Sequence, residues 1–511
     1  MSDDLPGPTT PCSPSPTRGP AHRILHNSAL NLGGQGVNAV CQLVVVFALA
    51  RGLGKAAFGE YYTLFALIMV TQLIVEAGLS TLLTYRIVHA PESWKETLAE
   101  AAGLFLVVVA VSMVVLIGLG CAWVYLRGDE PVVLIRFAAA ACACAAIQVQ
   151  RFSAGVFRAF EMFGYENFAR ALQGMLLVGL VLAMIGTGVA RVEWVLVALA
   201  ASHVASALFL LAALQYRWWC LALRFRWSAA KQWLSAAVPV GLGDVVRGLT
   251  WQLDTLLMAL FQPPAVVGIY SVAYRPLGPL NWLPRAVLTA AFPSFARLAA
   301  SDRHSLDRAF ANSIRLLWII SLPIVIAICM CAEPIITLLA GAEYLEAAIP
   351  MRILIWIAAL SYLSIQFRFL FTAVGRQDHF VRLVVIVFLL EAVIETLLIP
   401  QLSYFGACAG SFAGELFFTV VGLAVCRHLG VGSVEWGALM RAVLAGTVMG
   451  ALVWFARQAS LPLLLLAVVL STAIYLVLCL RLGALQMDEL RHLCRALMGL
   501  VRPGFVTAGK S

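Results

Sequence analysis

Long apolar stretches, each about the length of a membrane span, dominate the hydrophobic pattern of the chain. A helix needs about 20 mainly apolar residues to cross the hydrocarbon core of a bilayer. The pattern predicts an all-α integral membrane protein of about fourteen transmembrane helices, although short turns between neighbouring segments leave twelve or thirteen open. The segments are residues 26–49, 61–83, 101–124, 131–150, 168–188, 192–214, 233–259, 267–290, 311–332, 349–373, 380–399, 404–425, 438–456 and 461–480.

Composition excludes a soluble protein. The 511 residues are 62% hydrophobic and 12% charged, whereas soluble domains carry roughly 25% charged residues. The twelve cysteines are scattered and form no CxxC pair, so they favour helix packing over a zinc or redox site. The sequence therefore predicts a protein whose solvent is the bilayer.

Basic residues orient the predicted spans. Most of the 35 Lys and Arg fall in the segments on the side of the N-terminus, including Arg217, Arg224, Arg226 and Lys231 in one loop. Cytoplasmic loops carry such an excess, so both termini are expected in the cytoplasm. The net charge of +9 is spread loop by loop, which disfavours nucleic-acid binding.

An internal repeat organises the predicted spans. An offset of 209 residues aligns the first span with the seventh, and it brings Gly34 onto Gly243, Ala50 onto Ala259, Gly59 onto Gly268 and Tyr61 onto Tyr270. Both copies run from inside to outside, so two parallel lobes of about six helices each are expected. The expected parts are a disordered Pro-rich cytoplasmic tail (1–24), the N-terminal lobe (25–216), the C-terminal lobe (217–430), helices 13 and 14 (431–482) and a cytoplasmic amphipathic tail (483–511).

The first span carries a stripe of four amides, Asn31, Gln35, Asn38 and Gln42. Their spacings of 4, 3 and 4 residues place them on one face of a helix. Two interpretations remain open. The amides line a wet cavity and offer hydrogen bonds to a polar cargo, or they join helices by hydrogen bonds inside the membrane.

The seventh span is polar on the equivalent face. The repeat aligns Gln35 with Asp244 and Asn38 with Arg247, and Asp254 follows seven residues after Arg247. An arginine inside a bilayer must meet water or a partner. Arg247 is therefore either a ligand for an anionic cargo, since a guanidinium offers paired donors, or half of a structural pair with Asp244. Arg285 in the eighth span is a second candidate cation, or it extends to the inner interface.

Carboxylates form a third candidate group. Glu76 lies in the second span, Glu391 and Glu395 lie one turn apart in the eleventh, and Glu415 lies in the twelfth. Neighbouring carboxylates in a low dielectric disfavour a double charge, which would suit coupling to a proton or a sodium ion. Structural or solvated roles remain the alternative.

The sequence offers little for enzymes or nucleotide-driven pumps. It contains no HExxH or GxSxG pattern. One GxxxxGK[ST] match, GFVTAGKS at residues 504–511, follows a predicted amphipathic helix, whereas a loop for nucleotide phosphates follows a β-strand. No enzymatic activity, metal or cofactor is therefore expected.

A loop and several short runs resemble a known family. The run from Arg51 to Tyr61, RGLGKAAFGEY, is similar to the R-x-L-G-x-x-x-F-G-x-Y loop of the polysaccharide transporter family, within the multidrug/oligosaccharidyl-lipid/polysaccharide exporter superfamily. Further matches, in order, are residues 267–271, 292–297, 375–377 and 398–400. The resemblance implies a Wzx-type flippase that moves undecaprenyl-pyrophosphate-linked repeat units across the bacterial inner membrane for O-antigen, capsule or exopolysaccharide synthesis. It also implies two six-helix lobes around a central cavity that opens alternately to each side. In such a cavity the amide stripe would bind sugar hydroxyls, and Arg247 and Arg285 would bind the pyrophosphate.

Other functions stay open at this point. The related branches of the superfamily imply an ion-coupled multidrug exporter or a lipid II flippase as alternatives, and a scaffold for a polysaccharide assembly complex is a fourth. Expected partners are the lipid-linked oligosaccharide and membrane lipid, with a polysaccharide polymerase complex and a coupling ion as further candidates. Nothing in the sequence specifies the sugar.

Overall fold

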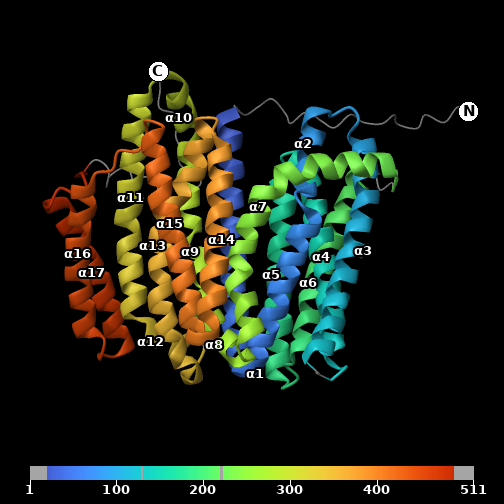
Figure 1. Cartoon of the computed structure of the whole chain (residues 1–511), viewed down its shortest axis with the longest axis horizontal. Coiled ribbons are helices and arrows are strands. Elements are labelled where there is room, and N and C mark those ends of the chain that lie inside the picture. Colours follow the sequence, from blue (N-terminus) through green and yellow to red (C-terminus); the bar gives the residue numbers. More distant parts are fainter. Residues whose placement is uncertain (1–19, 128–129, 219–222, 488–511) are drawn as a thin grey trace, which may run out of the picture.

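A computed structural model describes residues 20–127, 130–218 and 223–487, and every regular element in these ranges is a helix. Most of the helices run side by side along one direction (Figure 1). In chain order they are α1 (Pro20–Glu76), α2 (Leu79–His89), α3 (Trp94–Arg127), α4 (Val133–Ala159), α5 (Phe163–Gly186), α6 (Val192–Trp218), α7 (Trp227–Phe261), α8 (Pro264–Tyr274), α9 (Leu277–Leu280), α10 (Trp282–Ser301), α11 (Arg303–Met330), α12 (Ala332–Leu339), the 3₁₀ helix η1 (Ala342–Ala347), α13 (Ala348–Ala373), α14 (Gln377–Leu402), α15 (Tyr404–His428), α16 (Trp436–Ala456) and α17 (Leu461–Arg481).

Eleven helices in the described ranges are long and apolar enough to cross a membrane. The protein is therefore a multi-pass membrane protein, as its composition predicts. This number includes α1 only once. The 57-residue element joins two helices at Gly54, whose φ of 76° and ψ of 167° are not helical. The eleven also leave out α7 and the interrupted run from α8 to α10. The number fourteen and the division into two six-helix lobes remain predictions.

Several helix ends differ from the sequence-based limits. α1 begins at Pro20, so residues 20–24 of the predicted tail are helical. The predicted span 267–290 is broken into α8, α9 and the start of α10. α4 continues to Ala159 and α5 already begins at Phe163, so the loop expected between them is short. Residues 1–19 and 488–511, with most of the predicted amphipathic tail, lie outside the described ranges.

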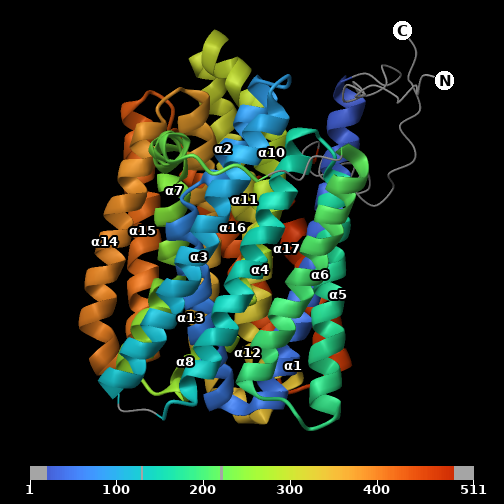
Figure 2. The same ribbon diagram turned by 90° about the vertical axis from the view of Figure 1, so that its right-hand side faces the viewer.

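Two groups of helices stand side by side. Helices α3 to α6 pack mainly on one another and on α1, whereas α11, α13, α14 and α15 form the second group; α7 packs against α14 on one side and against α1 and α2 on the other. In Figure 2 the first group, α3 to α6, faces the viewer. Below, the N-terminal bundle means α1–α6 and the C-terminal bundle means α7–α15. Helices α16 and α17 lie at the outer edge against α11 (Figure 1).

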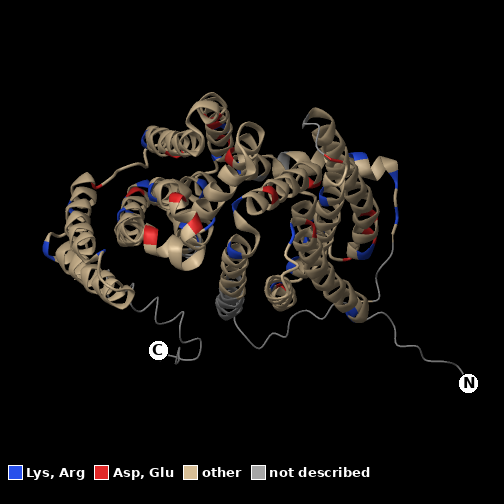
Figure 3. Ribbon diagram, turned by 90° about the horizontal axis from the view of Figure 1, so that it is seen from below, with Lys and Arg blue, Asp and Glu red and all other residues tan. Residues whose placement is uncertain are grey.

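The first half of α1 stands between the two bundles. It is the dark blue helix at the centre of Figure 1, and in Figure 3 it stands apart, next to the grey trace that leads to the N-terminus. Figure 3 also shows charged positions within both bundles. The amide stripe predicted on this helix therefore lies within reach of side chains from both bundles.

The bundles touch most closely at the lower end in Figure 1, where α1 meets α8. A Cβ atom on Gly59 would lie 1.7 Å from the carbonyl oxygen of Pro264, and one on Gly268 would lie 2.2 Å from that of Lys55. Only glycine permits such backbone contact between helices. The two glycines that the 209-residue offset aligns therefore lie against each other.

Side chains close the same lower end. Arg51 donates to the carbonyl oxygen of Leu338 at 2.5 Å. The ammonium of Lys55 lies 3.7 Å from a carboxylate oxygen of Glu346. These contacts join α1 to α12 and η1, so this end of the space between the bundles is shut.

Candidate functional site

A small polar cavity lies inside the C-terminal bundle. Its volume is about 90 Å³, and α7, α8, α9, α13, α14 and α15 all contribute to its wall. Charged groups, hydroxyls, an amide and three aromatic side chains share the lining. The residues are Arg247, Thr250, Trp251, Tyr274, Leu277, Asn281, Ile357, Ala358, Ser361, Val384, Val387, Glu391, Ser411, Glu415 and Phe418.

Arg247 is the cation of this cavity. It comes from α7 and interacts electrostatically with Glu391 of α14 and Glu415 of α15. The sequence predicted these residues separately, as a substrate ligand and as ion-coupling carboxylates, and the structure brings them into one cavity. The side chain of Asp244, the alternative partner of Arg247, lies outside the described side chains.

Glycines of α15 make room for the carboxylates of α14. A Cβ atom on Gly414 would lie 2.0 Å from Oε1 of Glu391, and one on Gly410 would lie 2.3 Å from Cγ of Glu395. The two glycines and the two glutamates each lie one helical turn apart, so the pairs meet in register. Glu391 and Glu395 are therefore buried between the helices, with exposed fractions of 6% and 1%.

Hydroxyl groups meet two of these carboxylates. Ser411 of α15 donates to Oε1 of Glu395 at 3.3 Å, and Ser364 of α13 donates to Glu415. The second oxygen of Glu395, Oε2, is buried and has no hydrogen-bond partner in the described part of the chain. An unpaired buried carboxylate oxygen is costly, which makes this position suited to a proton or a cation.

Asp254 extends the carboxylate group toward α8. It is 2% exposed, accepts from the backbone N–H of Thr255 at 2.6 Å and accepts from the hydroxyl of Tyr270. It also interacts electrostatically with Glu395 and with Arg275. Sequence analysis assigned Asp254 to the substrate cavity; it is not among the residues that line this small cavity, and its neighbours are buried polar groups.

Arg275 links this region to the N-terminal bundle. It follows α8, and its guanidinium lies 4.2 Å from the ring centroid of Tyr62 and 5.4 Å from that of Phe65, both on α1. The Asp254 carboxylate is its electrostatic neighbour on the other side. Arg275 therefore connects the buried carboxylates to the lower end at which the bundles meet. Sequence analysis did not single out this residue.

The amide stripe of α1 is partly exposed. Gln42 is exposed, and Asn38 is half-buried with an Oδ1 atom that is buried without a hydrogen bond. The opposite face of the helix exposes Val37, Val40 and Val44. Exposure on a polar face and on an apolar face fits a helix between a wet space and lipid. The side chains of Asn31 and Gln35 lie outside the described ones.

The remaining two candidates lie apart from this cavity. Arg285 is exposed on α10, where both of its interpretations stay open. Glu76 ends α1 in the N-terminal bundle, is 5% exposed and accepts from the hydroxyl of Ser80. Nε of Arg151 on α4 lies 3.9 Å from its other oxygen.

Arg151, with Arg158 and Arg170, is a group that sequence analysis missed. The predicted spans 131–150 and 168–188 place Arg151 and Arg158 in a loop, whereas the structure includes both in α4. Arg151 and Arg158 lie seven residues apart, which puts them on one face of a helix. This spacing could have revealed the pair, but the predicted span limits assigned both residues to a loop.

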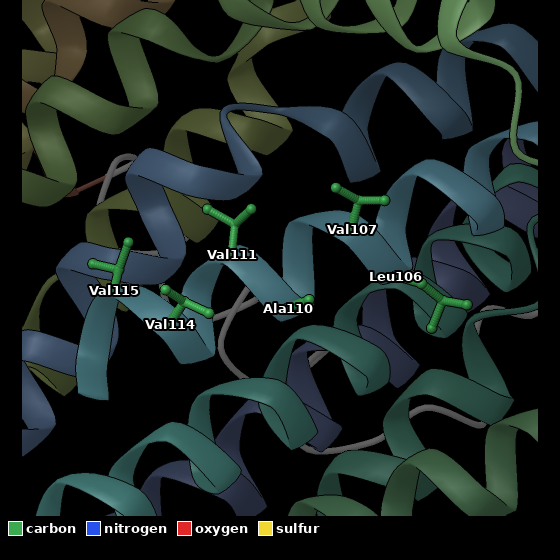
Figure 4. A pocket seen from close by; sticks show the side chains of 6 residues that line it. All are labelled: Leu106, Val107, Ala110, Val111, Val114 and Val115. Carbon is green, nitrogen blue, oxygen red and sulfur yellow. The ribbon is translucent and has the colours of Figure 1, made fainter. Parts of the chain in front are cut away.

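A larger groove is purely apolar. It has a volume of about 440 Å³ on the outer side of α3, and its lining is Leu106, Val107, Ala110, Val111, Val114 and Val115 (Figure 4). Such a surface suits lipid chains and offers no group for chemistry. Among the described residues, no cluster of His, Cys, Asp and Glu side chains could hold a metal ion.

Comparisons with known proteins identify the fold and the family. The family model described as "Polysaccharide biosynthesis protein" matches residues 24–299. The structure is similar to that of the lipid II flippase MurJ in an inward closed conformation, with a TM-score of 0.73, 11% identity and coverage of 87% of this chain and 96% of that chain. No curated protein sequence matches.

Two further solved structures share the fold. An inward-facing multidrug resistance MATE transporter has a TM-score of 0.66 at 15% identity, with coverage of 77% of this chain and 95% of that chain. A MOP superfamily transporter from Pyrococcus furiosus Vc1, described by the reverse polarity of its binding pocket, has a TM-score of 0.57 at 16% identity, with coverage of 80% and 95%. At these identities the likeness establishes the shared fold alone.

The electrostatic interactions of Arg247 with the carboxylates predict the outcome of a double-mutant cycle on thermal stability. Arg247→Gln should lower the thermal unfolding midpoint of the purified protein by roughly 5 °C or more, because removing one partner of a buried charge pair costs about 3–5 kcal/mol. Glu391→Gln should restore part of that loss when the two are combined. Arg382→Gln, which removes a 76% exposed arginine 3.7 Å from Asp378 on α14, is the control and should change little. Additive losses in the double variant would refute these electrostatic interactions.

Proposed function

The chain belongs to the polysaccharide biosynthesis protein family, and on this premise we propose that it is a flippase for undecaprenyl-pyrophosphate-linked oligosaccharide repeat units. It would carry them across the bacterial cytoplasmic membrane for O-antigen, capsule or exopolysaccharide synthesis, with both chain termini in the cytoplasm. It would act as a transporter without a catalytic step. A polysaccharide polymerase complex is the partner that would take up the product.

The observation that carries this proposal is a cation in a cavity inside the membrane. Arg247 lies in a polar cavity together with hydroxyls, an amide and the rings of Trp251 and Tyr274. Guanidinium groups bind phosphate oxygens with paired donors, and the exposed Gln42 of α1 supplies an amide for sugar hydroxyls. An apolar drug needs neither group.

Alternating access follows from the contact between the bundles. The lower end is closed by backbone contact at Gly59 and Gly268 and by the ion pair between Lys55 and Glu346. With the N-terminus in the cytoplasm this is the outer end. Release of the cargo to the outer leaflet requires these contacts to separate while the opposite end closes, in the manner of repeats that rock against each other.

Ion coupling would drive the cycle through the carboxylates. Glu391, Glu395 and Asp254 are buried, and Arg275 connects Asp254 to the rings of Tyr62 and Phe65 across the bundle interface. A proton or sodium ion that neutralises this group would weaken the electrostatic attraction between Asp254 and Arg275. The arrangement in which the lower end is closed would then become less stable relative to the open one.

A multidrug exporter is the second candidate. The buried carboxylates are the observation that favours it, because an acidic interior suits a cationic drug. Arg247 opposes it, since a cation in the cavity would repel such a cargo. A lipid II flippase, the third candidate, would bind a pyrophosphate by the same chemistry and differ in the sugar.

Genetic complementation tests the cargo class. Deletion of the gene should remove the surface polysaccharide and leave its lipid-linked repeat unit on the cytoplasmic side. Arg247→Ala should fail to restore the polysaccharide at unchanged protein level, and Arg247→Lys should restore part of it, because an ammonium keeps the charge without the paired donors.

The control for this experiment is Arg382→Ala, which removes an exposed arginine and should complement fully. Intact polysaccharide after the deletion, together with altered drug resistance, would exclude the flippase and support the exporter. Full complementation by Arg247→Ala would assign Arg247 a structural role.

Cross-linking tests the closed end. In a background without native cysteines, Lys55→Cys combined with Glu346→Cys should be joined by a short, reducible bifunctional thiol reagent, which spans the distance that two long side chains leave between their backbones. The cross-link should block complementation, and reduction should recover it. Arg136→Cys with Glu193→Cys, a pair within the N-terminal bundle whose parent side chains lie 3.5 Å apart, is the matched control and should remain active when cross-linked. A fully active cross-linked Lys55–Glu346 variant would contradict opening at this end.

Vesicle transport tests the coupling. With purified protein in vesicles, a proton or sodium gradient should accelerate movement of a pyrophosphate-linked lipid, and Glu395→Gln should abolish the acceleration. Glu92→Gln, a change at an exposed glutamate between α2 and α3, should preserve it. Gradient-independent transport by the wild-type protein would rule out ion coupling.

A further inference from the structure

Three arginines on the N-terminal bundle form a compact group that the proposed function has not used. Arg151 and Arg158 lie on α4, and Arg170 lies on α5. Their side chains are 48%, 37% and 36% exposed. Below, the arginine group means these three residues.

Two buried glutamates hold the arginine group in place. Glu166 on α5 is 4% exposed, accepts from Nη2 of Arg170 and lies 3.5 Å from Nε of Arg158. Glu76 lies 3.9 Å from Nε of Arg151, and Gln72, with its amide oxygen turned to the guanidinium, accepts from the same Nε at 3.2 Å. Each guanidinium is thus anchored by a carboxylate while its side chain stays partly exposed.

The arginine group faces away from lipid. Cys142 of α4 is exposed nine residues before Arg151, which is about two and a half turns and therefore the opposite side of the helix. On α5, Phe168 and Met175 are exposed at seven-residue spacing, and Arg170 points about 200° from that line. Exposed guanidinium on the side opposite to lipid requires water.

A buried donor lies one turn before Arg170 on α5. Among the described residues, Nδ2 of Asn167 is buried and has no hydrogen-bond partner. A buried donor needs an oxygen or water as partner. Three cations against two carboxylates also leave a surplus positive charge.

We propose that the arginine group, with Asn167, binds the diphosphate of the lipid-linked cargo at the entrance of the transport path. Arg158 is the penultimate residue of α4, at the end of the bundle where α1 begins, and the positive-inside orientation makes this the cytoplasmic side. This site is separate from Arg247, which lies in the other bundle. It rests on the proposed function for the identity of the cargo, while the diphosphate chemistry stands on the arginine group.

Binding to the purified full-length protein in detergent tests the site. The probes are inorganic pyrophosphate, farnesyl diphosphate and farnesol, with isothermal calorimetry as the measurement. Farnesyl diphosphate should bind and farnesol should not. Comparable binding of pyrophosphate would show that the diphosphate suffices, and weaker binding would show that the lipid chain adds to it; both support the site. No binding of either diphosphate, or equal binding of farnesol, would overturn it.

Variants locate the binding. Arg151→Gln and Arg158→Gln should each weaken farnesyl diphosphate binding about tenfold or more, because each removes a charged donor to phosphate. Arg158→Lys should fall between, which guards against a simple folding defect. Arg136→Gln is the matched control, since Arg136 lies on the same helix and is also held by two glutamates, Glu60 and Glu193, but near the other end. Equal losses in Arg136→Gln would overturn the assignment.

Complementation separates this inference from the proposed function. Loss of polysaccharide on deletion, with full complementation and normal binding by the arginine-group variants, would refute the site and leave the flippase intact. Normal polysaccharide after deletion, with diphosphate binding that depends on the arginine group, would refute the flippase and leave the site.

Discussion

A polar or charged group inside a bilayer needs a protein partner or water, because hydrocarbon supplies neither hydrogen bonds nor charge solvation. The interior of this protein follows from that constraint. Arg247 lies near Glu391 and Glu415, the hydroxyl of Tyr270 reaches Asp254, and Glu166 holds two arginines at once. Among the described residues, a buried polar atom without a partner, such as Oε2 of Glu395, marks a position where a ligand or an ion would be stabilised most.

Glycines decide which helices can bring these groups together. Gly410 and Gly414 let the glutamates of α14 press against α15, and Gly59 and Gly268 let α1 and α8 touch backbone to backbone. Small residues have this effect in membranes because van der Waals contact replaces the hydrophobic effect between helices. The same device therefore packs the carboxylates and forms the contact at which the bundles meet.

Much of the candidate site could be anticipated. The amide stripe on the first span follows from helical spacing. The 209-residue offset follows from matching residues, and the structure places two of them, Gly59 and Gly268, in contact. Arg247, Glu391 and Glu415 were each singled out by the cost of charge in lipid. Their union in one cavity could not be anticipated, because α7, α14 and α15 meet only through tertiary packing.

By itself, the sequence determined that this is a helical multi-pass membrane protein, since hydropathy and length decide which segments leave water. It also indicated the family, through short runs in a fixed order. Only the tertiary structure decided the neighbours of each charge: Glu76 turned out to anchor Arg151, and Asp254 to lie next to Tyr270. The physical reason is that hydropathy is a property of each segment, whereas a charge's partner depends on the depth and facing of two helices at once.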